Sequence, residues 1–116
     1  MATLVQIRSK AETVRRAKTA KWFHALSDEI RLEIVSMLTG GERCVCELME
    51  ELDMAQSRLS WHLKTLVDAG IVTTRRDGRW NFYTLVPEAL AEAHDILVSF
   101  KPTGRRLNVR CCYLSS

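Results

Sequence analysis

Hydrophobic residues recur at intervals of three and four along most of this chain, which is the period of an amphipathic helix. Ser27, followed by two acidic residues, suits the N-cap of a helix that stops at Gly40-Gly41. Pro87 stands where the first turn of a helix tolerates proline. Residues 1–8 are short and mixed, and we expect them to be loose. Five helices are therefore predicted, over residues 9–26, 28–38, 44–52, 55–69 and 88–100.

Two runs rich in β-branched and aromatic residues, 71–74 and 80–85, predict a pair of strands. They flank Asp77-Gly78, the strongest short signal of a hairpin. Gly70 stands where the preceding helix should end. Helices followed by a basic hairpin in this order predict a mainly α fold with a β-hairpin, the winged helix–turn–helix.

The chain is short, with 116 residues of which 47% are hydrophobic and 27% charged, so we expect one small globular domain. This domain should span residues 1–100, and a basic, cysteine-containing tail should follow over residues 101–116. The sequence has no run of eighteen apolar residues and no pattern of a signal peptide. We therefore expect a cytoplasmic location and no membrane partner.

Charge is distributed in blocks, although the net charge is only +3. Residues 1–27 carry six basic residues against one acidic residue, and residues 28–53 carry two against eight. Residues 54–80 are basic again, with five against two. A polyanion would meet the basic blocks and avoid the acidic one. Ordinary surface charge explains the same blocks equally well.

The helix predicted over 55–69 has two distinct faces on a helical wheel. Leu59, Leu63 and Leu66 share the inner face with His62, which we expect to be a satisfied core residue rather than a ligand. The outer face mixes small hydroxyls, a cation and Trp61, which suits phosphates and base edges in the major groove of DNA. A plain amphipathic helix with a solvated outside is the alternative, although an exposed tryptophan usually has a partner.

The predicted hairpin carries arginines around its tip, which suits contacts to phosphates or to the minor groove. A solubilising charge cluster would look the same. Together the helix and the hairpin give the candidate DNA-binding residues: Gln56, Ser57, Arg58, Ser60, Trp61, Lys64, Arg75, Arg76 and Arg79.

Four cysteines stand as two close pairs, Cys44/Cys46 and Cys111/Cys112. Clustered cysteines in a cytosolic protein indicate metal or redox chemistry, and thiolate sulfur selects soft, thiophilic ions. A helix N-terminus with Arg43 beside it should favour the thiolate form of the first pair. Side chains two positions apart in a helix point about 200° from each other, so both sulfurs reach one ion only if the first turn is absent or unwinds. Alternatively, Cys44 and Cys46 pack as small hydrophobic residues, and the tail pair has no role.

Three segments and the hairpin tip together resemble the ArsR/SmtB family, which is made up of small homodimeric bacterial repressors that leave DNA when a metal ion or metalloid binds. The segments are Ala25-Leu26-Ser27-Asp28-Glu29-Ile30-Arg31-Leu32, Cys44-Val45-Cys46-Glu47-Leu48 and Gln56-Ser57-Arg58-Leu59-Ser60-Trp61-His62-Leu63, with the tip Arg76-Asp77-Gly78-Arg79-Trp80. The resemblance covers about residues 20–90, and it implies that the first and last helices form the dimer interface.

Within that family, a Cys-x-Cys in this place is the thiolate site of arsenic and antimony sensors and of cadmium and lead sensors. Arsenic sensors often have a third cysteine three residues later, where this chain has Met49. Cadmium and lead sensors draw further cysteines from the N-terminal arm, and this chain has none before Cys44. We expect Cys111 or Cys112 to supply the missing sulfur, within one subunit or across the dimer.

The resemblance and the residues together predict a homodimeric transcriptional repressor that binds double-stranded operator DNA. Trivalent arsenic or antimony, inorganic or methylated, would release it by binding the cysteine thiolates, with no permanently bound cofactor. The same fold could respond instead to cadmium or lead, or to thiol oxidation. A winged helix used for protein interaction is a third alternative. No enzyme is expected, since the sequence has neither a phosphate loop nor a plausible catalytic triad.

Overall fold

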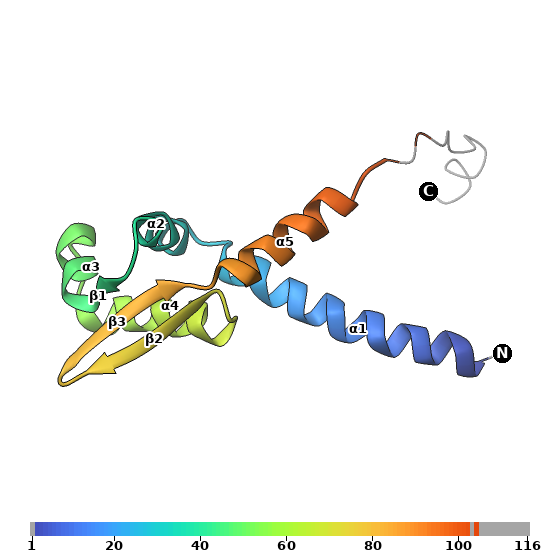
Figure 1. Cartoon of the computed structure of the whole chain (residues 1–116), viewed down its shortest axis with the longest axis horizontal. Coiled ribbons are helices and arrows are strands. Elements are labelled where there is room, and N and C mark those ends of the chain that lie inside the picture. Colours follow the sequence, from blue (N-terminus) through green and yellow to red (C-terminus); the bar gives the residue numbers. More distant parts are fainter. Residues whose placement is uncertain (1, 103, 105–116) are drawn as a thin grey trace.

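The computed structural model describes residues 2–102 and 104, and Figure 1 shows their arrangement. The elements follow one another along the chain as α1 (Ala2–Ala25), α2 (Glu29–Leu38), β1 (Arg43–Cys44), α3 (Val45–Leu52), α4 (Gln56–Asp68), β2 (Val72–Asp77), β3 (Trp80–Leu85) and α5 (Pro87–Ser99). All five predicted helices and both predicted strands are present. Among the described residues, no helix combines the length and apolar character needed to cross a membrane.

The starts of α1 and α2 differ from the prediction. The first helix begins at Ala2, so the expectation of a loose start was wrong; neither proline nor glycine interrupts the first 25 residues. The N-cap of α2 is Asp28 rather than Ser27, because the Asp28 carboxylate accepts the backbone N–H groups of Ile30 and Arg31 at 2.8 and 3.2 Å. The Ser27 hydroxyl instead donates to the backbone carbonyl of His24.

The sheet has three antiparallel strands in the order β1-β3-β2, and β1 was not predicted. Asp77 pairs with Trp80, so the two turn residues are Gly78 and Arg79, one position later than Asp77-Gly78. Gly78 has φ of 63°, and the first of two turn residues having positive φ is typical of a type II′ hairpin. The two longer strands form the wing, whose tip lies at the end of the molecule opposite the N-terminus (Figure 1).

The hydrophobic core lies between α2, α3, α4 and the base of the wing. Its fully buried members include Ile34, Leu48, Leu63, Leu66 and Ile71. A Schellman motif ends α4: the N–H of Gly70 donates to Val67 and that of Ile71 donates to Leu66, and Gly70 has φ of 81°. Trp22 and Ala25 at the end of α1 join this core, as do Ala89, Ala93 and Ile96 along α5, and beyond these contacts the two helices diverge (Figure 1).

Candidate thiol site and nucleic-acid interface

Cys44 and Cys46 bring their sulfurs within 2.6 Å of each other, and both thiols are free. Cys44 is the N-cap of α3 and has extended backbone, with φ of −75° and ψ of 147°. It therefore lies outside the helix, and the helical projection that would separate the sulfurs by 200° does not apply. Of the two predicted conditions for both sulfurs to reach one ion, an absent or an unwound first turn, the structure has the first: no helical turn contains both cysteines.

Two carboxylates hold the segment around these sulfurs. The Glu47 side chain accepts the backbone N–H of Cys44 at 3.1 Å, while the Cys44 sulfur accepts the N–H of Cys46 at 3.4 Å, which together form a capping box. Arg43 donates to Glu51 at 2.7 Å and lies 3.8 Å from Glu47. The Cys44 side chain is buried and that of Cys46 is exposed.

The charge around Cys46 does not favour its thiolate. Its hydrogen bond with Cys44 raises the pKa of the Cys46 thiol, and partial desolvation of this exposed group raises it further. Arg43 is paired with Glu51 and Glu47, so its charge is largely neutralised by those carboxylates. The prediction that Arg43 promotes the thiolate form was wrong for Cys46.

A third ligand for a soft ion is absent from the described part of the chain, where no group of three Cys, His, Asp or Glu side chains could hold a metal. Met49 is half-buried and packs against the core. Cys111 and Cys112, the predicted source of another sulfur, lie outside the described residues. The chemistry of Cys44 and Cys46 fits two of the ligands of a thiophilic centre.

The faces of α4 are those that the wheel predicted. Leu59, His62, Leu63 and Leu66 are buried. The predicted DNA-binding residues of this helix, Gln56, Ser57, Arg58, Ser60, Trp61 and Lys64, are all exposed. Trp61 is 62% exposed, and its ring centre lies 5.6 Å from the guanidinium of Arg31 and 5.1 Å from the His62 ring, to which it is nearly perpendicular. The outer face of α4 is therefore open to a partner.

His62 is a core residue with its hydrogen bond satisfied, as predicted. Arg31 donates to its Nδ1 at 3.1 Å, so the ring must be neutral with its proton on Nε2. Burial lowers the pKa of His62 below 6.5, Asp28 opposes this shift, and the cations Arg31 and Arg58 add to it.

Arg31 is the residue that the sequence did not single out for a role. It is only 4% exposed, and it also donates to the carbonyls of Ala25 and His24 at 2.7 and 3.3 Å. Arg31 thus connects the end of α1 to α4. Its position within residues 25–32, one of the segments that resemble the family, was the available signal.

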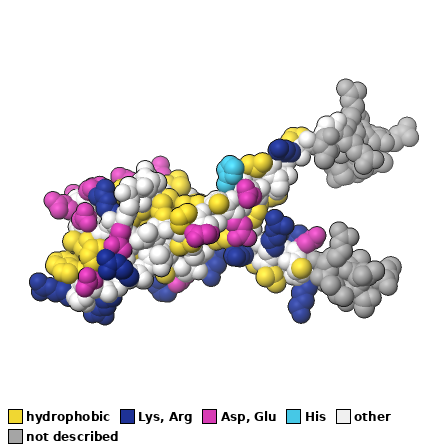
Figure 2. Space-filling model, in the orientation of Figure 1, with side chains coloured by type: hydrophobic (Ala, Val, Ile, Leu, Met, Phe, Trp, Pro, Cys, Tyr) yellow, Lys and Arg dark blue, Asp and Glu magenta, His cyan; other side chains and the backbone are white. Residues whose placement is uncertain are grey.

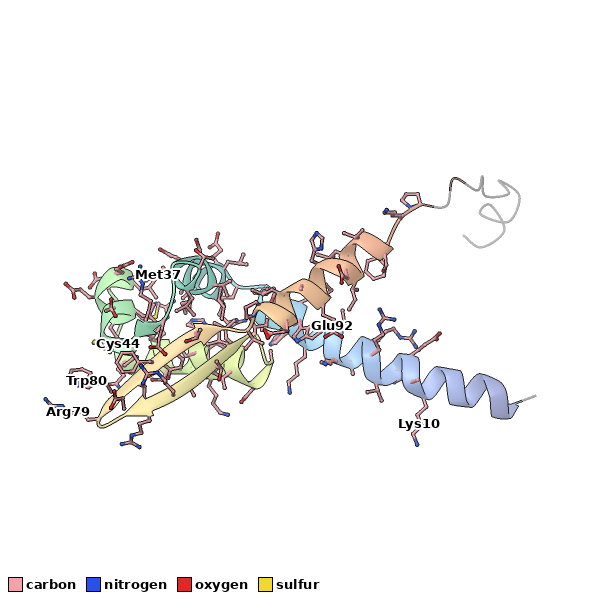
Figure 3. The ribbon with its side chains drawn as sticks, in the orientation of Figure 1. Lys10, Met37, Cys44, Arg79, Trp80 and Glu92 are labelled. Atoms are coloured by element: carbon pink, nitrogen blue, oxygen red, sulfur yellow. The ribbon has the colours of Figure 1, made fainter. Side chains whose placement is uncertain are left out.

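The three arginines of the wing have different surroundings. Arg75 donates two hydrogen bonds to Glu42 and lies over the Phe82 ring. Arg76 donates to the carbonyl of Gly78, and Arg79 lies over the Trp80 ring at the hairpin tip. Figure 3 shows Arg79 pointing away from the body, and Figure 2 shows Lys and Arg side chains gathered at this end of the molecule. Arg79 is therefore open to a partner, whereas the exposed Arg75 side chain is held by Glu42.

A family model described as "Bacterial regulatory protein, arsR family" matches residues 28–74. The arsenical resistance operon repressor of Bacillus subtilis (strain 168) is 42% identical over 81 residues, which make up 69% of this chain and 75% of that repressor. The chain belongs to the arsR family of bacterial regulatory proteins. It is a transcriptional regulator and not an enzyme, as predicted.

Further similarities agree with this family assignment. The arsenical resistance operon repressor of Staphylococcus aureus is 50% identical over 60 residues, covering 52% of this chain and 58% of that repressor. The solved structure of an ArsR-like transcriptional regulator from Rhodococcus sp. RHA1 has a TM-score of 0.67 and 28% identity, covering 73% of this chain and 80% of that chain. The predicted winged helix–turn–helix fold is thereby confirmed.

Proposed function

We propose that this arsR-family regulator is a homodimeric repressor that leaves operator DNA when trivalent arsenic or antimony binds Cys44 and Cys46. One observation carries the proposal: the two sulfurs meet at 2.6 Å, at the junction of α3 with the strand that pairs with the wing. Relatives named arsenical resistance operon repressors support arsenic or antimony as the inducer, in inorganic or methylated form.

Arsenic–sulfur bonds can form at these thiols without an external base. Each arsenic–sulfur bond that forms from arsenous acid releases one water, made from the thiol proton and one hydroxide of arsenic. Cys44 and Cys46 supply two such bonds, and a methylated trivalent arsenical needs no more. For inorganic arsenic we propose Cys111 or Cys112 as the third sulfur.

The DNA contacts would come from the exposed face of α4 and from the wing. Trp61 and Lys64 lie on the exposed face of α4, Arg79 lies on the wing, and all three are open to solvent. An α-helix fits the major groove, and an arginine at a hairpin tip suits phosphates or the minor groove. We infer that Arg75 has a lesser part in DNA contact, because Glu42 occupies its guanidinium.

The proposed dimer would form through α1 and α5. A cavity of about 550 Å³ lies between these helices and is lined mainly by apolar atoms, with Phe23, Ile96 and Phe100 among its residues. Val14, Leu97 and Phe100 are 64%, 55% and 70% exposed, which a second copy of the chain would cover. A two-fold dimer would bind half-sites about one helical turn, roughly 34–36 Å, or a multiple of that apart.

The proposal is tested by fluorescence anisotropy with an operator duplex that the protein has selected from a randomised pool. Binding should weaken steeply with salt, as phosphate contacts require. Arsenite, antimonite or methylarsenite should then release the duplex, and cadmium or lead should do so less effectively. A protein that binds no duplex, or one that arsenite never releases, would refute the proposal.

Thiol oxidation is a second candidate trigger, which the short distance between two free sulfurs favours. Peroxide would convert one thiol to a sulfenic acid, which the other thiol would attack to form a disulfide and release water. In the same assay, peroxide without metalloid would release DNA and a reductant would restore binding. Release by arsenite in the presence of excess reductant distinguishes the primary proposal from this one.

A further inference from the structure

Glu42 and Arg75 form a paired contact between the segment that leads into the thiol site and the wing. Arg75 Nε and Nη2 donate to the two carboxylate oxygens of Glu42 at 2.8 and 2.7 Å. The Thr84 hydroxyl, on the strand between them, donates to Glu42 at 3.4 Å. Two parallel hydrogen bonds fix direction as well as distance, so this contact orients the Arg75 side chain.

The register of the sheet places this contact beside the thiols. Cys44 pairs with Phe82 on one side, and Phe82 pairs with Arg75 on the other. Paired residues project on the same face of a sheet, so Cys44, Phe82 and Arg75 form one row across it. The Arg75 guanidinium lies 4.5 Å from the centre of the Phe82 ring. Glu42 precedes Cys44 by two residues and reaches across β3 to the far end of this row.

Ligand binding at the thiols must disturb this row. The Cys44 sulfur accepts the backbone N–H of Cys46 and so caps the start of α3. A ligand atom bonded to that sulfur competes with this hydrogen bond, so the backbone around Cys44 must adjust. Because Cys44 belongs to β1, part of that adjustment falls on this strand and on Glu42, which immediately precedes it.

We propose that Glu42 is a positioning residue: through Arg75 it transmits the state of the Cys44–Cys46 pair to the wing and so lowers DNA affinity when the thiols are occupied. This inference rests on the proposed function and adds the route by which ligand binding at the thiols reaches the wing. With the thiols free, Glu42 holds Arg75 over the Phe82 ring and fixes the wing for DNA. Ligand binding shifts β1, and the wing loses that position.

The charges support this arrangement. The hydrogen bond from Arg75 lowers the pKa of the Glu42 carboxyl, and the same bond raises the pKa of Arg75. Both groups therefore stay ionised at neutral pH, and the contact persists until geometry breaks it. A contact that merely stabilised the wing would change the unfolding free energy on mutation but not the response to ligand.

The test measures a coupling ratio, defined as the operator Kd with saturating arsenite divided by the Kd without it. Glu42→Gln keeps the shape of the side chain and removes its charge. We expect it to reduce the ratio by about fivefold or more, within the usual range of coupling between sites. Glu33→Gln makes the same change of charge at an exposed position of α2 and should leave the ratio unchanged. Arsenite bound per chain, measured directly by arsenic analysis after gel filtration, should be the same in all variants.

Epistasis decides whether Glu42 acts through Arg75. Arg75→Gln should reduce the ratio to a similar value, and adding Glu42→Gln to it should reduce the ratio no further. Arg75→Lys keeps the charge without the paired donors and should also show the reduced ratio, while circular dichroism checks that each variant is folded. A wild-type ratio in Glu42→Gln, or additive effects in the double variant, would overturn the inference and leave the proposed function intact. A wild type that does not respond to arsenite would overturn both.

Discussion

Replacing Arg31 by methionine should destabilise the protein substantially. Arg31 is 4% exposed and donates to Ala25, His24 and His62, so its guanidinium joins the end of α1 to α4. The last carbonyls of a helix have no partner within the helix, and Arg31 supplies one. Methionine fills much of the same apolar volume but donates no hydrogen bond.

The magnitude follows from what the substitution leaves behind. Hydrogen bonds from a charged donor contribute about 1.5–3 kcal/mol each, and a buried acceptor left without a donor costs about 1–3 kcal/mol. The three bonds share one side chain and are not additive, and His24 keeps the Ser27 hydroxyl as a donor. Removing a buried charge also returns part of its desolvation cost. We therefore expect Arg31→Met to lower the unfolding free energy by about 3 kcal/mol.

Urea unfolding followed by circular dichroism measures this change, at one fixed protein concentration because association would shift the midpoint. Arg58→Met is the matched control, since Arg58 is exposed on α4, and it should stay within about 0.5 kcal/mol of wild type. A loss below about 1 kcal/mol for Arg31→Met would refute the reasoning, because the buried donors would then be dispensable.

Three further results are expected. As the pH falls below about 6.5, the unfolded chain protonates its histidine before buried His62 does, so the unfolding free energy should fall; His62→Gln should flatten that decline in urea titrations, and equal slopes would contradict the assignment. Cadmium displaces thiol protons, whereas arsenous acid releases water. As the pH is raised from about 6 to 8, the cadmium concentration needed to release operator should therefore decrease, while the arsenite concentration needed should stay nearly constant. Parallel pH profiles for the two ions would argue against binding at thiols. Arg79→Gln should reduce the slope of log K against log salt by about 1 for each phosphate that Arg79 neutralises, measured by anisotropy over a salt series, and an unchanged slope would remove Arg79 from the interface.

The parts of the fold that local patterns determine were predicted from the sequence. The inner face of α4 follows from the spacing of Leu59, Leu63 and Leu66. Gly70 marks the end of the same helix because a C′ residue needs positive φ, and Pro87 marks the start of α5. His62 was assigned to the core by its place on the apolar face, and the structure agrees.

Contacts between distant segments could not be predicted in this way. The strand β1 has only two residues, and its pairing with β3 spans 38 positions between Cys44 and Phe82. The contacts of Arg31 with His62 and of Glu42 with Arg75 also join distant segments. The spacing of Cys44 and Cys46 left open whether the first turn is absent or unwinds for a related reason: the helix was predicted to include Cys44, and the short strand ends at that residue.

The response of operator binding to arsenite in cysteine variants tests the central claim most directly. Serine is a good N-cap residue, so Cys44→Ser with Cys46→Ser should keep α3 and bind operator as wild type does. We predict that arsenite, at concentrations that release wild type, leaves this double variant bound in the anisotropy assay. Release of the double variant by the same arsenite concentration would contradict the assignment of Cys44 and Cys46 as the trigger.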